Sequence, residues 1–226
     1  MERCSLTAVQ LTGLRFGPGH IHDISLALLP GRLTVVIAPD ERRRRLLLRL
    51  LGGAGAIASG ALVYRGADQH VDLATACARD VATVRARAIV NSANLPTPRP
   101  CQTAEQAVAE AAHTTVRGAG TELRALGHGH VIGRMTGELD GPDRAVLMIA
   151  AVLLHPAPIG LIDLTNLGDG LSRAWPRIEF RLDTGRSILA VTDAVCDGLP
   201  EHAETLLLTA DGTLRSTSLA AEPIAP

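Results

Sequence analysis

The sequence predicts an α/β protein with a mixed, largely parallel central sheet. Apolar runs of strand length alternate with longer helix-type segments, and several strands follow one another early in the chain. The early strands predict a smaller antiparallel sheet at one edge, and residues from about 95 to 154 predict a helical lobe. With 226 residues, of which 46% are hydrophobic, the chain can bury a substantial core. We expect one domain over residues 1–219 and a disordered tail at 220–226.

The first part of the chain predicts a hairpin and then a strand–turn–helix unit. Strands are expected at Ser5–Leu14 and Ile21–Leu29, separated by a turn at 17–19 that contains Gly, Pro and Gly. A third strand, Leu33–Ile37, is rich in β-branched residues. It leads through a polar turn into a leucine-rich helix, for which the glycines at 52–53 provide a suitable end.

The middle of the chain predicts two short strands followed by helices. The strands are expected at Gly60–Tyr64 and Val84–Val90. Three prolines within 96–100 exclude regular structure there, because they fix φ and remove hydrogen-bond donors. Helices are expected at Thr103–Val116, which is rich in alanine, and at Glu122–Leu126, with a loop after them.

The last third of the chain alternates helices and strands and closes with a hairpin. The expected elements are a helix at Arg144–Leu154, a strand at Ile159–Leu164, a helix at Leu171–Leu182 interrupted near Pro176, a strand at Ser187–Thr192 and a hairpin over 205–215. The longest apolar run, Ala145–Leu154, is far shorter than the ~20 residues that a membrane-spanning helix needs.

The stretch from Arg32 to Gly53 has the frame of a phosphate-binding loop: a buried strand, an abrupt turn and a helix. Such a loop follows G-x-x-x-x-G-K-[ST], whose glycines let backbone N–H groups surround phosphate and whose hydroxyl binds Mg²⁺. The same positions here hold Ala38, Pro39, Asp40, Glu41, Arg42, Arg43, Arg44 and Arg45, followed by Leu46. All 22 basic residues of the chain are arginine, so any mechanism that needs a lysine is excluded in its usual form.

The order of the motifs resembles the nucleotide-binding domain of ABC transporters over nearly the whole chain. The signature LSGGQR of that family is similar to a segment that begins Leu139, Asp140, Gly141, Pro142 and Asp143. At the usual spacing after it, Asp163 takes the Walker B position. The positions of the adenine-stacking aromatic residue, the Q-loop glutamine and the switch histidine are taken by Phe16, Asn91 and Asp193. The resemblance implies a P-loop NTPase-like ABC ATPase fold.

Several departures from the family pattern predict that catalysis is impaired. Arg44 takes the position of the lysine, Arg45 that of the Mg²⁺-binding hydroxyl, and Glu41 and Arg43 replace glycines. The catalytic positions are altered at Asn91, at Leu164 (the general-base glutamate of the family) and at Asp193. Pro142 and Asp140 also change the signature. Because one lost group typically costs about 10²–10⁴-fold in rate, independent hydrolysis is not expected.

The resemblance also implies ligands and partners. ATP and Mg²⁺ are the implied ligands, and the substitutions count against both. Nucleotide would contact Phe16, the loop from Ala38 to Leu46 and the signature-like residues, and Asp163 would hold the metal. The implied partners are a membrane permease subunit or a second ABC ATPase subunit, in a homodimer or a heterodimer. The chain would be cytoplasmic, peripheral to the inner face of the membrane through the permease. Its net charge of −1 argues against nucleic acid.

Two other functions remain open from the sequence. The chain could be an active ATPase that uses Arg44 in place of lysine, or an interaction or nucleic-acid-binding module that uses the cluster Arg42–Arg45. Simpler interpretations also exist for single residues: a solvated helix start for the arginines, a polar strand end for Asp163 and a core position for Phe16. His128 and His130 are expected to be loop residues without a carboxylate partner.

Overall fold

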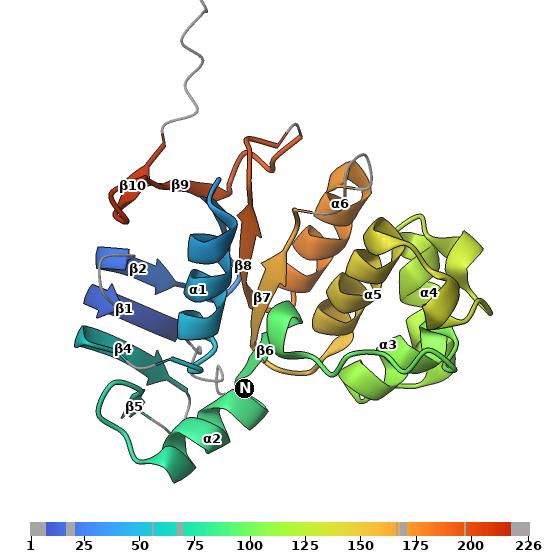
Figure 1. Cartoon of the computed structure of the whole chain (residues 1–226), viewed down its shortest axis with the longest axis horizontal. Coiled ribbons are helices and arrows are strands. Elements are labelled where there is room, and N and C mark those ends of the chain that lie inside the picture. The colour runs from blue at the N-terminus through green and yellow to red at the C-terminus, as the bar shows by residue number, and fades with distance from the viewer. Residues whose placement is uncertain are drawn as a thin grey trace, which may run out of the picture.

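The computed structural model describes residues 8–16, 21–55, 57–66, 70–165, 167, 171–196 and 198–217 (Figure 1). The predicted turn at 17–19 and the predicted tail at 220–226 lie outside these residues. Two sheets and six α-helices make up the described part of the chain. Within it, no helix combines the length and the apolar character needed to cross a membrane.

The N-terminal strands form an antiparallel sheet, as predicted. Its order is β2 (Ile21–Leu28), β1 (Ala8–Phe16), β4 (Ser59–Arg65) and β5 (His70–Asp72). The sequence did not indicate β5, which has only three residues. The backbone N–H of His22 donates to the carbonyl of Gly212, at 2.8 Å, and this bond joins the antiparallel sheet to the closing hairpin of the other sheet.

The larger sheet is mixed and largely parallel, which confirms the predicted fold class. Its order is β10 (Leu214–Ser216), β9 (Glu204–Leu208), β3 (Leu33–Ile37), β8 (Ser187–Thr192), β7 (Ile159–Asp163) and β6 (Ile89–Asn91). Among the described strands of this sheet, only β10, at the edge, pairs antiparallel. Every residue of β3 and of β8 is buried, as expected for parallel strands covered on both faces.

The central sheet separates two hydrophobic cores because successive strand residues face opposite sides. Val35 and Ala190 join the core formed with α5 (Gly141–Leu154) and α6 (Leu171–Leu182), whereas Val36 and Val191 join the core beneath α1 (Glu41–Leu51) and the antiparallel sheet. Figure 1 shows α1 between the antiparallel sheet and the central strands, with α5 and α6 on the other side.

Two helices extend the core formed with α5 and α6 away from the sheet. These are α3 (Ala104–Ala112) and α4 (Val116–Ala125), and both pack against α5 (Figure 1). The predicted single helix Thr103–Val116 was therefore too long. It stops because His113 adopts a left-handed conformation with φ of 53°, and Thr115 then caps the next helix by accepting the N–H of Gly118.

Three other predictions of elements require correction. The predicted strand Val84–Val90 is mostly helix, because α2 (Ala78–Arg87) precedes the short strand β6. Helix α5 begins at Gly141 rather than Arg144, and α6 continues through Pro176 instead of breaking there. Three short 3₁₀ turns complete the described structure: η1 (Ser92–Asn94), η2 (Gly129–Val131) and η3 (Thr136–Glu138).

Candidate functional site

The carboxyl ends of β3, β8 and β7 lie side by side in the central sheet, next to the N-terminus of α1. Ligands of parallel α/β sheets characteristically bind beyond this edge. The chain leaves β3 at Ala38, whose N–H donates to the carbonyl of Thr192 at 2.7 Å. This bond ties the turn that precedes α1 to the end of β8.

Asp40 closes the first turn of α1. Its Oδ1 accepts the backbone N–H of Arg43 at 2.8 Å, which makes it the N-cap of the helix. The same hydrogen bond is the main reason why the pKa of Asp40 is lowered, with a smaller contribution from the charge of Arg43. A free N-terminal amide of a helix can bind an anion, but here a carboxylate of the chain itself occupies that position.

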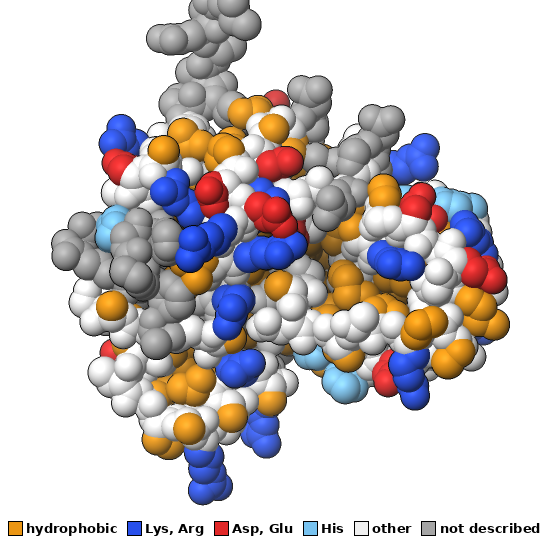
Figure 2. All heavy atoms as spheres, in the orientation of Figure 1, with side chains coloured by type: hydrophobic (Ala, Val, Ile, Leu, Met, Phe, Trp, Pro, Cys, Tyr) orange, Lys and Arg blue, Asp and Glu red, His pale blue; other side chains and the backbone are white. Residues whose placement is uncertain are grey.

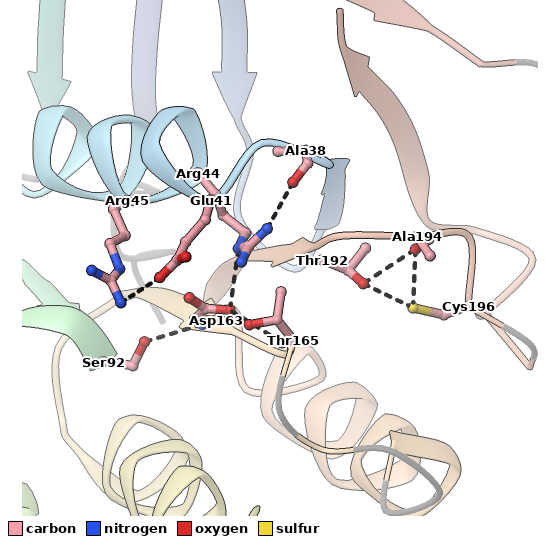
Figure 3. A network of polar contacts seen from close by, with 10 residues as sticks. All are labelled: Ala38, Glu41, Arg44, Arg45, Ser92, Asp163, Thr165, Thr192, Ala194 and Cys196. Carbon is pink, nitrogen blue, oxygen red and sulfur yellow. Dashed lines mark hydrogen bonds and ion pairs between the residues drawn. The ribbon is translucent and has the colours of Figure 1, made fainter. Parts of the chain in front are cut away.

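Arg44 is buried, although it belongs to the cluster interpreted as a solvated helix start. Its Nη1 donates to the carbonyl of Ala38 at 2.9 Å, and its Nε lies 3.8 Å from Oδ1 of Asp163 (Figure 3). Only 9% of the side chain is exposed. The solvated interpretation is therefore wrong for Arg44, which bridges the end of β3 and the end of β7.

Asp163 is held by hydroxyl groups as well as by Arg44. Its Oδ1 accepts hydrogen bonds from the hydroxyl of Thr165 at 2.7 Å and from the backbone N–H of Thr165 at 3.1 Å (Figure 3). The backbone N–H of Asp163 donates to Oγ of Ser92 at 3.0 Å. The sequence did not single out Ser92 or Thr165. Ser92 directly follows β6 and Thr165 lies two residues after the end of β7, and these positions at strand ends are the signal that could have identified them.

Two other arginines of the cluster also have partners within the chain. Nη1 of Arg43 donates to the carbonyl of Thr209 at 3.2 Å, and Arg45 pairs with Glu41 one helical turn before it. Figure 2 shows acidic side chains among the basic ones on the face over α1. Internal pairing thus offsets part of the positive charge that four consecutive arginines place at a helix N-terminus.

A cleft of about 520 Å³ opens beside Asp163. It lies between α1, η1 and the first turns of α5, and it is lined by Arg45, Arg49, Ser92, Ala93, Asn94, Ala145, Met148 and Asp163. The cleft combines two basic side chains, one carboxylate and a partly apolar wall.

The three altered catalytic positions do not converge in this cleft. Asn91 is buried and donates from Nδ2 to the carbonyl of Leu48 at 2.7 Å, so it packs the end of β6 against α1. Leu164 points into the hydrophobic core. Asp193 is exposed just after β8. The structure therefore joins Arg44 and Asp163 but gives Asn91 and Leu164 packing roles.

The remaining predicted contacts are distributed over other elements. The backbone of Phe16, the last residue of β1, pairs with that of Ile21. The structure does not describe the side chain of Phe16. The signature-like segment forms the start of α5. Asp140 is the N-cap and accepts the N–H of Asp143 at 2.9 Å, while Leu139 is buried before the helix.

One expectation about histidines is wrong. His128 and His130 do have a carboxylate partner, because the chain folds back and places both next to Asp143. Their loop follows α4, and Asp143 lies fifteen and thirteen residues further along, at the start of α5. No local spacing rule indicated this contact.

Comparison with known proteins gives structural neighbours only. No protein-family model matches the chain, and no curated protein sequence matches it. A solved dimeric bacterial ABC transporter cassette superimposes with a TM-score of 0.72 at 14% identity, covering 94% of this chain and 99% of that one. A post-hydrolysis cassette bound to ADP and Pi gives 0.72 at 15% identity, with the same coverage.

A further neighbour from Pyrococcus furiosus, an ABC transporter ATP-binding protein, has a TM-score of 0.68 at 14% identity and covers 88% of this chain and 96% of that one. Because the similarity extends over nearly the full length of both chains, it identifies the architecture. The chain has the fold of an ABC transporter ATP-binding cassette.

Proposed function

We propose that this chain is an ABC-type ATP-binding subunit that has lost hydrolysis and acts as a structural or regulatory partner of a permease or of a second ATPase subunit. One observation carries the proposal. Arg44, in the position of the phosphate-binding lysine, is buried between the carbonyl of Ala38 and the carboxylate of Asp163. The two groups expected to hold phosphate and Mg²⁺ are instead paired with each other.

The loop residues do not fit a bound Mg-nucleotide. A backbone cradle for phosphate alternates right-handed and left-handed residues. Among the described non-glycine residues, His113 is the one with positive φ, and it lies outside this loop. In addition, Asp40 accepts the N–H of Arg43, which a phosphate would otherwise approach. These features support a site closed to Mg-ATP.

The position after Asp163 supports the loss of hydrolysis. Attack by water needs a general base near the reacting phosphate. Leu164 follows the strand end here, and its side chain lies in the core with 2% exposure. No step of hydrolysis is therefore assigned to this chain.

A partner would supply the activity of the assembly. The cassette that gives one of the best superpositions was solved as a dimer. We infer that this chain pairs in a similar way with an active subunit or docks on a permease at the cytoplasmic face of a membrane. The internal pairing of Arg43, Arg44 and Arg45 counts against the alternative of a free arginine module for nucleic acid.

Calorimetry with Mg-ATP tests the proposal. The wild-type protein is expected to show no saturable binding at millimolar nucleotide, while an active cassette measured in parallel binds. A variant with Ala38→Gly, Glu41→Gly, Arg43→Gly, Arg44→Lys and Arg45→Ser is expected to gain binding, because the cradle and the ammonium return. Saturable Mg-ATP turnover by the wild type, abolished in Asp163→Ala, would instead establish the active ATPase that uses Arg44.

A further inference from the structure

We propose that His128, His130 and Asp143 form a binding site for a divalent transition-metal ion of the zinc class. The inference does not depend on the proposed function, because that proposal is argued from Arg44, Asp163 and the loop before α1; of the three residues here, only Asp143 belongs to the signature-like segment. Among the residues that the structure describes, this is the group of three metal-ligating side chains whose ligand atoms come close together: all three atoms lie within 4.8 Å of one another.

The distances suit tetrahedral coordination. Oδ1 of Asp143 lies 3.3 Å from Nδ1 of His128 and 3.1 Å from Nε2 of His130. Ligand bonds of about 2.0–2.2 Å in a tetrahedral zinc site place neighbouring ligand atoms roughly 3.3 Å apart. Both nitrogen–oxygen distances are already near this value. The two nitrogens can approach each other through rotation of His130, whose side chain is 56% exposed.

The fold fixes the positions of two of the three ligands, Asp143 and His128, without a bound metal. Asp143 lies in the first turn of α5, which Asp140 caps, and only 10% of its side chain is exposed. His128 is similarly enclosed, with 15% exposure. The loop that carries both histidines is tied down by backbone bonds from His128 to Leu123 and from Val131 to His128. A site that is organised in advance loses less conformational entropy on binding.

The chemistry of the ligand set also favours this class of metal. Imidazole and carboxylate together are typical zinc ligands, and three protein ligands leave the fourth position to water. The exposed side of His130 provides the opening for that water. The positive charge of Arg134 opposes binding of a metal cation, because its Nη1 lies 3.8 Å from Oδ2 of Asp143. It faces the other carboxylate oxygen, so Oδ1 remains available for coordination.

Titration of tag-free protein with Zn²⁺ tests the site. Cys4, Cys77, Cys101 and Cys196 are first replaced by serine, so that thiols do not compete. The protein is expected to bind one Zn²⁺ per chain. His128→Gln and His130→Gln are each expected to weaken binding at least 10-fold, since even supporting residues of metal sites cost about 10–100-fold. Arg134→Gln is expected to tighten binding severalfold by removing a nearby cation.

A double variant His70→Gln/His202→Gln is the matched control, because it removes two exposed histidines from other parts of the fold. Its affinity is expected to equal that of the parent. Folding of every variant is checked by circular dichroism in the presence of chelator. No binding by the parent, or equal affinity in the parent and both site variants, would overturn the proposal.

X-ray absorption on the zinc-loaded parent keeps the test decisive if a histidine variant fails to fold. Two imidazole ligands and additional oxygen ligands are expected. A coordination shell with one imidazole or none would overturn the assignment.

Discussion

Arg44 illustrates how one residue can keep its charge and change its role. A lysine ammonium is a compact charge on a flexible stem, whereas a guanidinium is planar and offers several donors in fixed directions. Nη1 of Arg44 satisfies the carbonyl of Ala38, and its Nε faces Asp163. The Arg44 side chain is largely removed from water, at 9% exposure, and the carboxylate of Asp163 compensates part of its charge.

His155 gives a pH dependence that belongs to a single residue. Its Nδ1 accepts the N–H of Ala157 at 3.1 Å, which requires that nitrogen to be unprotonated. Burial, followed by the nearby positive charge of His113 and Arg186, lowers the pKa of His155 below its ordinary value of 6.5. The unfolded chain therefore takes up a proton first as the pH falls through 6.5, and the folded state loses stability.

We expect His155→Asn, which retains an acceptor but does not titrate, to flatten this dependence. Between about pH 7.5 and about pH 5.5, the free energy of unfolding should fall more in the wild type than in the variant. Urea unfolding at several pH values measures the difference. His70→Asn, at an exposed position on β5, serves as the control and should follow the wild type. Parallel pH curves for wild type and His155→Asn would contradict the assignment.

At the scale of elements, a buried carboxylate joins α4 to α6. Glu122 accepts two bonds from Arg177, at 3.0 and 2.7 Å, and one from Arg181, at 3.0 Å. Its side chain is 3% exposed, and the bond from Arg177 raises the pKa of that guanidinium. The two helices are separated by a long stretch of chain, so this ion-pair cluster is a long-range connection within the helical part of the fold.

We expect Glu122→Gln to lower the free energy of unfolding by about 3 kcal/mol, because two arginines lose their buried counter-charge. Glu110→Gln provides the control: Glu110 pairs with Arg99 at 2.8 Å but is 57% exposed, and the loss should stay below about 1 kcal/mol. Denaturant unfolding of both variants compares them directly. Equal, small losses would show that the buried cluster does not stabilise the contact between α4 and α6.

At the scale of the whole molecule, the two cores share the central sheet. Side chains from β3 and β8 contribute to both, so α1 and the helices α5 and α6 are fixed to opposite faces of the same strands. The cleft beside Asp163 lies where α1 and α5 approach each other around η1. Its shape therefore depends on the packing of both cores.

If the site is closed, nucleotide should not drive association of this chain with itself. We expect light scattering to give the same molar mass with and without millimolar Mg-ATP. The variant with the restored loop, described above, is the comparison that can respond to nucleotide. A wild-type mass that doubles only in Mg-ATP would contradict a closed site.

Much of the fold could be predicted because local chemistry determines it. The run Leu33–Ile37 and the run Ser187–Thr192 are strands with the predicted bounds, since continuous β-branched and aliphatic residues between turns favour buried parallel strands. Helix α2 was missed because only Val84 is buried on it, which leaves almost no apolar periodicity. The end of α3 at His113 depends on one left-handed residue, which the alanine-rich sequence does not indicate.

The sequence by itself determined most of the strands and helices in their order, β5 and α2 excepted, and the residues that occupy the nucleotide-loop positions. Only the tertiary structure decided what those residues contact. Arg44 and Asp163, or His128 and Asp143, meet because strand pairing and helix packing bring distant segments together. Such contacts depend on the cooperative packing of both cores, whereas the propensities that predict single elements act over a few neighbouring residues.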